Sequence, residues 1–171
     1  MLAEEVYKLC VAHAEPLQID PYLSLALCEQ ESAFNHQAVR MENGFFRKYT
    51  EPMALATTTE ILLACSYGLG QVMGQVLREM GFFDFYKQYH NAHNTFQLTD
   101  AVSERAVPEA INAFMVRPAW QVEWSVKKLK RCLDAVGGNV NNALLRYNGG
   151  GNPDYPVEVM KKFEKLDRKF D

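Results

Sequence analysis

The chain has 171 residues, of which 48% are hydrophobic and 23% are charged, and its formal net charge is −3. This composition is typical of one globular domain with a hydrophobic core, and the negative charge excludes a broad basic surface for nucleic acid or anionic lipid. No stretch approaches the roughly 20 apolar residues that a membrane-spanning helix needs. The first residues, MLAEEVYKLC, do not resemble a signal peptide. We therefore expect a protein that is made in the cytosol and is soluble there.

The hydrophobic spacing predicts a mainly α-helical chain with about seven to nine helices. The first covers residues 2–14. Asp20, followed by proline, is a strong N-terminal cap for a second helix, which we expect to reach about Asn35. The stretch 39–53 contains glycine, proline and mixed charge, so it is predicted to be a loop with a short strand around residues 45–46.

Glycine and proline set the boundaries in the second half. A tight turn at 66–70 leads into a helix that ends at Met80, because Gly81 suits the left-handed cap. The stretch 82–117 is expected to be irregular or to contain one or two short helices. No repeat or linker divides the chain, so we expect a single domain over 1–171. The remaining helices are predicted at 54–63, 118–136 and 139–147, and from Pro156 onward.

Two carboxylates stand near the end of the second helix, and their positions differ. Leu23, Leu27 and Glu31 are spaced by four residues and share one face, whereas Glu29 points to another side. Apolar neighbours raise the pKa of a carboxyl from about 4.3 toward roughly 6–7, where it can hold and donate a proton. Glu31 is thus a candidate general acid. The alternative is a structural acid that faces solvent or pairs with an arginine such as Arg40.

Two further segments combine glycines with polar side chains. SYGLGQVMGQ places Gln71 just after a glycine turn, where its amide can both donate and accept hydrogen bonds. ALLRYNGGGNPDYP ends a helix with Tyr147 and Asn148 beside a glycine run. Considered alone, these segments fit a packing turn and a helix cap better than a binding site.

Together, and in this order, three motifs resemble those of soluble lytic transglycosylases, a superfamily that includes the goose-type lysozymes. They are ES-x-F-N at 31–35, S-Y-G-L-G-Q at 66–71 and Y-N-G-G at 147–150. The resemblance covers about residues 18–165 and is most pronounced for the phage-borne branch, the endolysins and virion-associated lysins. It implies a lysozyme-like α fold. It also implies cleavage of the β-1,4 bond between N-acetylmuramic acid and N-acetylglucosamine in peptidoglycan.

The resemblance also implies residue roles. Glu31 would be the catalytic acid and then the base, and Tyr155 would close the far wall of the cleft. The second motif departs from its common form at Gly70, where methionine is usual, and we expect a locally wider cleft with Met73 supplying the apolar contact. Neither a cofactor nor a metal is implied. The implied substrate-binding residues are Ser32, Tyr67, Gly68, Gln71, Tyr147 and Asn148, with Glu42, Met73 and Tyr155 as secondary candidates.

Four aromatic and histidine residues outside the motifs have competing interpretations. His90 and His93 are three residues apart and suit one face of a helix, but no third metal ligand is close in the sequence, so we interpret them as surface residues. Trp120 and Trp124 are one helical turn apart and can stack on sugar. Core packing is the preferred interpretation, because their helix also carries several aliphatic residues.

The implied mechanism needs one carboxylate, whereas most glycosidases use two. Glu31 would protonate the glycosidic oxygen, and the sugar's N-acetyl group, held by Gln71 or Tyr147, would stabilise the cation-like intermediate. Ionised Glu31 would then deprotonate the muramic acid 6-hydroxyl, which closes onto C1 as a 1,6-anhydro product. A hydrolase would need a second acid to activate water. Glu42 is the candidate for that role, unless it only pairs with Arg40 or Arg47.

Several functions stay open at this stage. The first is a phage lytic transglycosylase, and the second is a hydrolytic lysozyme (muramidase) on the same fold. A non-catalytic glycan-binding virion protein and a host-encoded transglycosylase of a secretion machine are the others. The implied partner is the glycan strand of bacterial peptidoglycan, with a holin or virion components as further candidates, and with neither nucleic acid binding nor membrane insertion. The protein would reside in the host cytoplasm before lysis or on the virion, and act on the periplasmic or extracellular cell wall.

Overall fold

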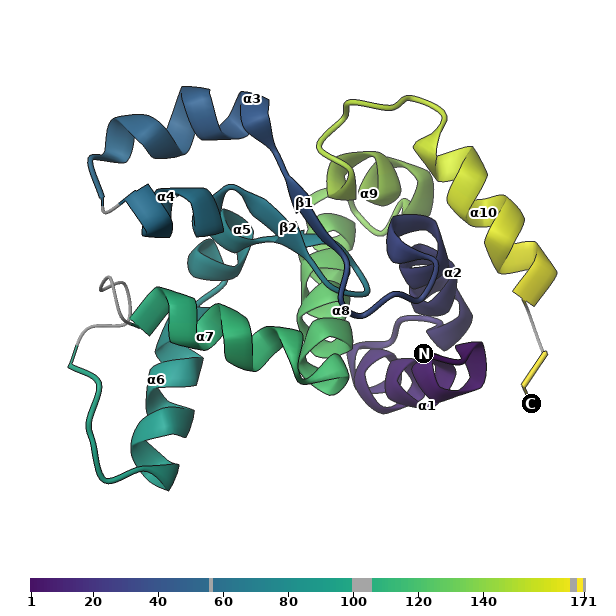
Figure 1. Cartoon of the computed structure of the whole chain (residues 1–171). Coiled ribbons are helices and arrows are strands. Elements are labelled where there is room, and N and C mark those ends of the chain that lie inside the picture. The colour runs from purple at the N-terminus through teal and green to yellow at the C-terminus, as the bar shows by residue number, and fades with distance from the viewer. Residues whose placement is uncertain (56, 100–105, 167–168, 171) are drawn as a thin grey trace.

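The computed structural model describes residues 1–55, 57–99, 106–166 and 169–170 and is mainly α-helical (Figure 1). Among the described residues, no helix combines the length and the apolar character needed to cross a membrane. The α-helices are α1 (Ala3–Ala14), α2 (Pro21–Ser32), α3 (Asn43–Phe45), α4 (Thr57–Leu63), α5 (Gly74–Glu79), α6 (Phe82–His93), α7 (Ala106–Met115), α8 (Pro118–Ala135), α9 (Val140–Tyr147) and α10 (Tyr155–Leu166). The shorter turns are η1 (Glu15–Leu17), η2 (Phe46–Thr50) and η3 (Glu51–Met53), and the strands are β1 (Val39–Met41), β2 (Cys65–Tyr67) and β3 (Val72–Met73).

Helix α8 runs through the middle of the molecule and divides its core (Figure 1). Val122, Val126 and Leu129 face a cluster formed with α1, α2, α9 and α10. Trp124 points to the other side, into a cluster built from α4 to α7 and the small sheet. Burial of each such side chain contributes about 1.5–3 kcal/mol. Helix α8 therefore packs on both halves of the core and lies between them.

The helix starts that the sequence predicts are confirmed where capping residues set them. The Asp20 carboxylate accepts a hydrogen bond from the Tyr22 amide at 2.8 Å, and Pro21 occupies the first helical position. Asn139 caps α9 in the same way by accepting from the Asn142 amide at 2.9 Å. Gly81 has the expected left-handed conformation, with φ of 84°.

Two predicted segments were wrong in detail. Helix α2 ends at Ser32, earlier than predicted, because residues 33 and 34 both adopt left-handed conformations and turn the chain back. The strand predicted at 45–46 lies instead at 39–41, and residues 43–53 form consecutive helical turns in which the rings of Phe45 and Tyr49 lie 4.8 Å apart. For the stretch 82–117, the alternative of one or two helices is confirmed, because α6 and α7 occupy most of its described part.

The interpretation of the tryptophans as core residues is confirmed. Trp124 is buried and Trp120 packs against the same cluster, where both contact the ring of Phe82. The residues packed around Trp124 leave no face of its ring available to a sugar. Cys10, Cys28 and Cys132 are buried, small residues of the other cluster.

The sheet, although small, decides which residues face the upper surface. Its order is β1-β2-β3, antiparallel throughout. Arg40 pairs with Ser66, which pairs with Met73, so these three residues form one row across the sheet. Successive side chains of a strand point to opposite faces. Tyr67 and Val72 of the neighbouring row are therefore turned into the core and buried, whereas Val39 at the end of that row is exposed.

Candidate active-site cleft

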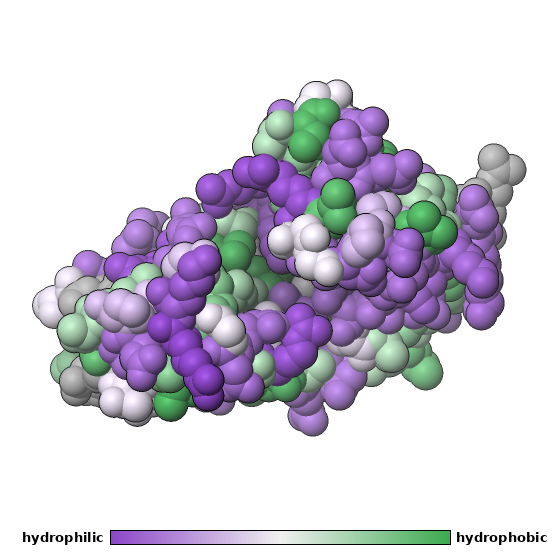
Figure 2. Space-filling view, turned by 90° about the horizontal axis from the view of Figure 1, so that it is seen from above, coloured by the Kyte–Doolittle hydropathy of each residue, from purple (hydrophilic) through white to green (hydrophobic). Residues whose placement is uncertain are grey.

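A cleft of about 410 Å³ opens on the upper face, between the sheet with α3 on one side and the end of α9 on the other. Figure 2 shows this face, which is hollowed near its middle, with apolar residues inside and hydrophilic residues around the rim. Helix α8 supplies the floor through Lys128, and α2 contributes its last turn through Glu31. The volume falls within the range of small-molecule sites in proteins, about 300–1,000 Å³.

Glu31 is half-buried and its carboxyl lines the cleft. The Tyr155 hydroxyl at the start of α10 donates a hydrogen bond of 2.5 Å to Glu31 Oε1. Burial raises the pKa of Glu31 above its ordinary value of 4.5, although the Tyr155 hydroxyl and the positive charges of Lys128 and Arg40 act in the opposite direction. This is the direction that the spacing of Leu23, Leu27 and Glu31 predicts.

Glu29, the other carboxylate of this helix, has a different environment. Its carboxylate lies 3.8 Å from the Lys162 ammonium of α10 and does not line the cleft. The two acids are therefore separated by the helical rotation between them, as the sequence predicts. Glu29 is a natural control for substitutions of Glu31.

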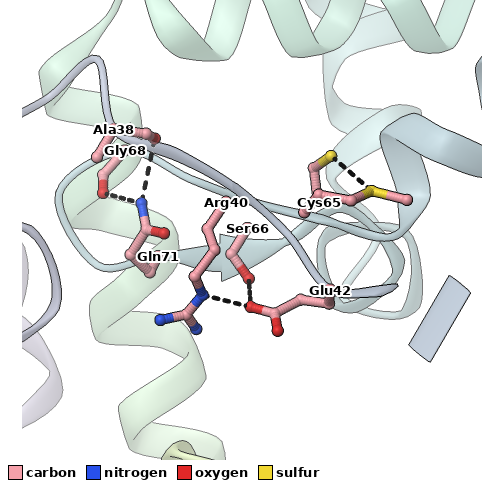
Figure 3. A network of polar contacts seen from close by, with 8 residues as sticks. Ala38, Arg40, Glu42, Cys65, Ser66, Gly68 and Gln71 are labelled. Carbon is pink, nitrogen blue, oxygen red and sulfur yellow. Dashed lines mark hydrogen bonds and ion pairs between the residues drawn. The ribbon is translucent and has the colours of Figure 1, made fainter. Parts of the chain in front are cut away.

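Gln71 lines the cleft from the turn between β2 and β3 (Figure 3). Its side-chain nitrogen Nε2 donates to the carbonyl oxygens of Ala38 at 3.1 Å and of Gly68 at 3.0 Å. The side chain is thereby fixed, and within the described residues its oxygen Oε1 has no hydrogen-bond partner. This oxygen can accept a hydrogen bond from an N–H group of a ligand in the cleft.

Arg40, Glu42 and Ser66 form a second polar group on the sheet side of the cleft (Figure 3). Arg40 Nε donates to Glu42 Oε1 at 2.7 Å, and Ser66 Oγ donates to the same oxygen at 3.2 Å. The ion pair with Arg40, which the sequence left as one interpretation of Glu42, is present. Glu42 nevertheless lines the same cleft as Glu31.

The end of α9 supplies Tyr147 and Asn148 to the opposite wall. Tyr147 is buried and its hydroxyl donates to the Gly70 carbonyl at 2.8 Å. Burial raises its pKa well above the ordinary value. Tyr155, and not Tyr147, therefore holds Glu31, while Tyr147 anchors the turn. Met73, a secondary candidate, also lines the cleft.

Among the described residues, the primary candidates Ser32, Tyr67 and Gly68 do not line the cleft, and neither does Tyr155, which was expected to close its far wall. Ser32 Oγ lies 2.9 Å from the Leu69 carbonyl oxygen and 3.1 Å from that of Cys28, so it joins the end of α2 to the turn. Tyr67 is buried and its hydroxyl donates to the Leu62 carbonyl at 2.8 Å. Gly68 is buried too, with φ of 68°. These three primary candidates shape the framework around the cleft.

Gln121 is a residue that sequence reasoning missed. Its side chain is fully buried in α8, its Oε1 accepts from the Leu69 amide at 3.0 Å, and its Nε2 lies near three carbonyl oxygens. A Cβ atom on Gly68 would lie 2.4 Å from Gln121 Oε1, so only glycine allows this approach. A glutamine among aliphatic residues of one helix gave no warning of this role, because its partners come from distant segments.

The histidines of the HNAH sequence make local contacts. His90 Nδ1 lies 3.4 Å from the Asn91 side-chain oxygen, and His93 Nδ1 lies 2.7 Å from the Tyr89 carbonyl oxygen. No cluster of three potential metal ligands occurs within the part of the chain that the structure describes.

Comparisons of the chain with protein-family models, with curated proteins and with solved structures gave no match. Function is therefore inferred from the cleft and from the motif residues around it.

The turn at Gly70 corrects the expectation of a wider cleft. A Cβ atom here would lie 1.9 Å from Ser125 Oγ, 2.6 Å from Ser125 Cβ and 3.0 Å from the Tyr147 hydroxyl. The space that a side chain would need is thus filled from α8 and α9, and the cleft is not enlarged at this position.

We expect Gly70→Ala to lower the free energy of unfolding by about 1–3 kcal/mol, because the added methyl group overpacks a filled site. Thermal and urea unfolding followed by circular dichroism measure the change. Gly151→Ala is the matched control, since a Cβ atom there meets nothing within 4 Å and the residue has no positive φ. Equal stability of the two variants would contradict close packing around Gly70.

Proposed function

We propose that the protein is a peptidoglycan lytic transglycosylase with a lysozyme-like fold, carried by a phage as an endolysin or virion-associated lysin. It cleaves the β-1,4 bond between N-acetylmuramic acid and N-acetylglucosamine. One observation carries the proposal: residues from the three sequence motifs, Glu31, Gln71 and Tyr147–Asn148, line one cleft, although they are far apart in the sequence. The carboxyl among them is desolvated, as a general acid requires.

In the first step, Glu31 donates its proton to the glycosidic oxygen. The hydrogen bond from Tyr155 occupies Oε1, so the other carboxyl oxygen carries the proton toward the substrate. The bond between C1 of the muramic acid and the glycosidic oxygen breaks, and the leaving N-acetylglucosamine keeps the donated proton as its 4-hydroxyl.

The positive charge that develops on the muramic acid ring is stabilised by its own acetamido group. The carbonyl oxygen of that group approaches C1, while its N–H donates to Gln71 Oε1. Gln71 is suited to this role because both of its amide hydrogens are directed to the protein backbone, so its oxygen orientation is fixed before the substrate arrives.

In the second step, ionised Glu31 accepts the proton of the muramic acid 6-hydroxyl. The 6-oxygen then bonds to C1 and releases the acetamido oxygen, which gives the 1,6-anhydro product. Water is not consumed, and Glu31 regains its proton. One carboxyl is therefore sufficient for both proton transfers, and the nearby positive charge of Lys128 favours its ionised form between them.

A hydrolytic lysozyme is the second candidate, and the position of Glu42 favours it. This carboxylate lines the same cleft, and Arg40 and Ser66 hold one of its oxygens. The remaining oxygen can activate a water molecule for attack on C1. The two mechanisms differ in their products and in their need for Glu42.

We expect Glu31→Gln to lower the rate of sacculus solubilisation by a factor of about 10²–10⁴, because the proton donor is lost. Glu29→Gln should keep the wild-type rate. Turbidity loss of purified sacculi measures both. A Glu31→Gln enzyme that still solubilises sacculi at more than a tenth of the wild-type rate contradicts the proposed role.

The same variant should not be less stable than the wild type at neutral pH. Burial raises the pKa of Glu31 in the folded chain, so the unfolded chain loses this proton first as the pH rises, and ionisation opposes folding. Glutamine removes this effect. The melting temperature of Glu31→Gln relative to wild type should therefore increase from pH 4 toward neutral pH, as thermal scans at several pH values can test.

Product analysis separates the two mechanisms. We expect mass spectrometry of digested sacculi to show 1,6-anhydro-muropeptides for the wild type and for Glu42→Gln, because the proposed mechanism does not use a second acid. Reducing ends in place of anhydro termini, together with loss of activity in Glu42→Gln, would establish the lysozyme. Glycan binding without turnover by the wild type would leave a non-catalytic binding protein.

Tyr155→Phe should raise the pKa of Glu31, because the lost hydroxyl hydrogen bond stabilises the ionised carboxylate. The alkaline limb of kcat/KM, where protonated Glu31 is lost, should move to higher pH, and kcat should fall on the order of tenfold as the carboxyl loses its fixed orientation. Tyr49→Phe, which removes the hydroxyl of an exposed tyrosine, is the control. An unchanged alkaline limb would show that Tyr155 has only a packing role.

A further inference from the structure

The sign of the charge that lines the cleft differs from the net charge of the whole chain. The protein carries a net charge of −3, yet the cleft lining contains the cations Arg40, Lys128 and Arg146 and the acids Glu31 and Glu42. With three cations and two acids, the lining of the cleft is more positive than the chain as a whole.

The pairing of these groups separates them into two classes. Arg40 and Glu42 form a 2.7 Å ion pair with each other. Lys128 and Arg146 have no carboxylate within ion-pairing distance among the described residues. These two positive charges of the cleft therefore have no direct counter-ion in the part of the chain that the structure describes.

Lys128 differs in this respect from the other lysines of α8. Lys127 pairs with Glu123 at 2.7 Å, and Lys130 pairs with Asp134, each one helical turn away. The Lys128 ammonium instead lies 3.7 Å from the centroid of the Tyr147 ring, on the floor of the cleft. Helix α8 thus neutralises its outer lysines and directs the unpaired one inward.

The position of Lys128 is unfavourable for a cation in the free protein. Burial lowers its pKa to about 8, even though the charge of Glu31 acts to raise it, so the ammonium form still dominates at neutral pH. A poorly hydrated ammonium over an aromatic ring binds an incoming anion with little further loss of hydration. Arg146 lies at the exposed rim of the same cleft and presents a planar guanidinium, which suits a carboxylate.

We propose that Lys128 and Arg146 form a subsite that binds a carboxylate carried by the glycan, so that the cleft selects muramic acid polymers over uncharged N-acetylglucosamine polymers. This inference rests on the proposed function, because it assigns the substrate of the same cleft. Only the muramic acid units bear carboxylates. These belong either to the lactyl ether at the 3-position or to the peptide attached to it, and the chemistry of recognition is the same for both.

Binding measurements on the Glu31→Gln protein test the proposal without turnover. Isothermal titration calorimetry compares three tetrasaccharides: an uncharged chitin oligomer, an alternating muramic acid oligomer with free lactyl carboxylates, and the same oligomer with its peptides. We expect at least one carboxylate-bearing ligand to bind about tenfold more tightly than the chitin oligomer at low salt. A preference that occurs already without peptides identifies the lactyl group as the source, and one that needs peptides identifies the peptide.

Substitutions assign the preference to residues. Lys128→Met and Arg146→Gln, each added to Glu31→Gln, should reduce the preference several-fold, and the two together should abolish it while chitin affinity is kept. Lys130→Met, on the outer face of α8, should leave the preference unchanged. The subsite is refuted if all three ligands bind equally, or if the preference persists in the double variant. Failure to bind any of them would instead count against the proposed function as well.

Discussion

The positions of the segments around the cleft depend on one buried side-chain amide, that of Gln121 in α8. Its oxygen accepts the Leu69 amide, and its nitrogen lies within 3.2 Å of the carbonyl oxygens of His36, Phe114 and Met115. These partners belong to the turn after β2, the chain between α2 and β1, and the end of α7. Replacing this amide with an apolar side chain would leave several buried backbone groups without a hydrogen-bond partner, at a cost of about 1–3 kcal/mol each. The amide therefore fixes both halves of the molecule to α8.

The turn that Gln121 holds is also where the three sequence motifs meet. Ser32, from the first motif, contacts the Leu69 carbonyl, and Tyr147, from the third, donates to the Gly70 carbonyl. The second motif is thus a backbone turn onto which the other two dock, and this explains why its glycines are close to Gln121 and Ser125. Several polar motif residues hold the framework together, whereas Glu31, Gln71 and Asn148 line the cleft with side-chain atoms that have no hydrogen-bond partner among the described residues.

The sequence predicts features that depend on local spacing and fails where tertiary packing decides. The face of Glu31 follows from its distance to Leu27, and the caps of α2 and α9 follow from single residues. The inward turn of Tyr67 depends on strand register, which its own segment does not encode. Tyr155 reaches Glu31 only because α10 packs against α2. Lys128 carries no sequence signal either, because its neighbours Lys127 and Lys130 have the same residue type and opposite surroundings.

The two desolvated groups of the cleft, Glu31 and Lys128, shift each other's pKa. A carboxylate bound in the proposed subsite would change the pKa of Glu31. In the free cleft the ammonium of Lys128 favours ionised Glu31, in the same sense as Arg40 and the Tyr155 hydroxyl, while Glu42 opposes them. A ligand carboxylate paired with Lys128 would cancel much of its field, so the pKa of Glu31 would rise as the substrate binds. Proton donation would then be favoured when a muramic acid unit is in place, because the group that recognises the substrate also controls the acid.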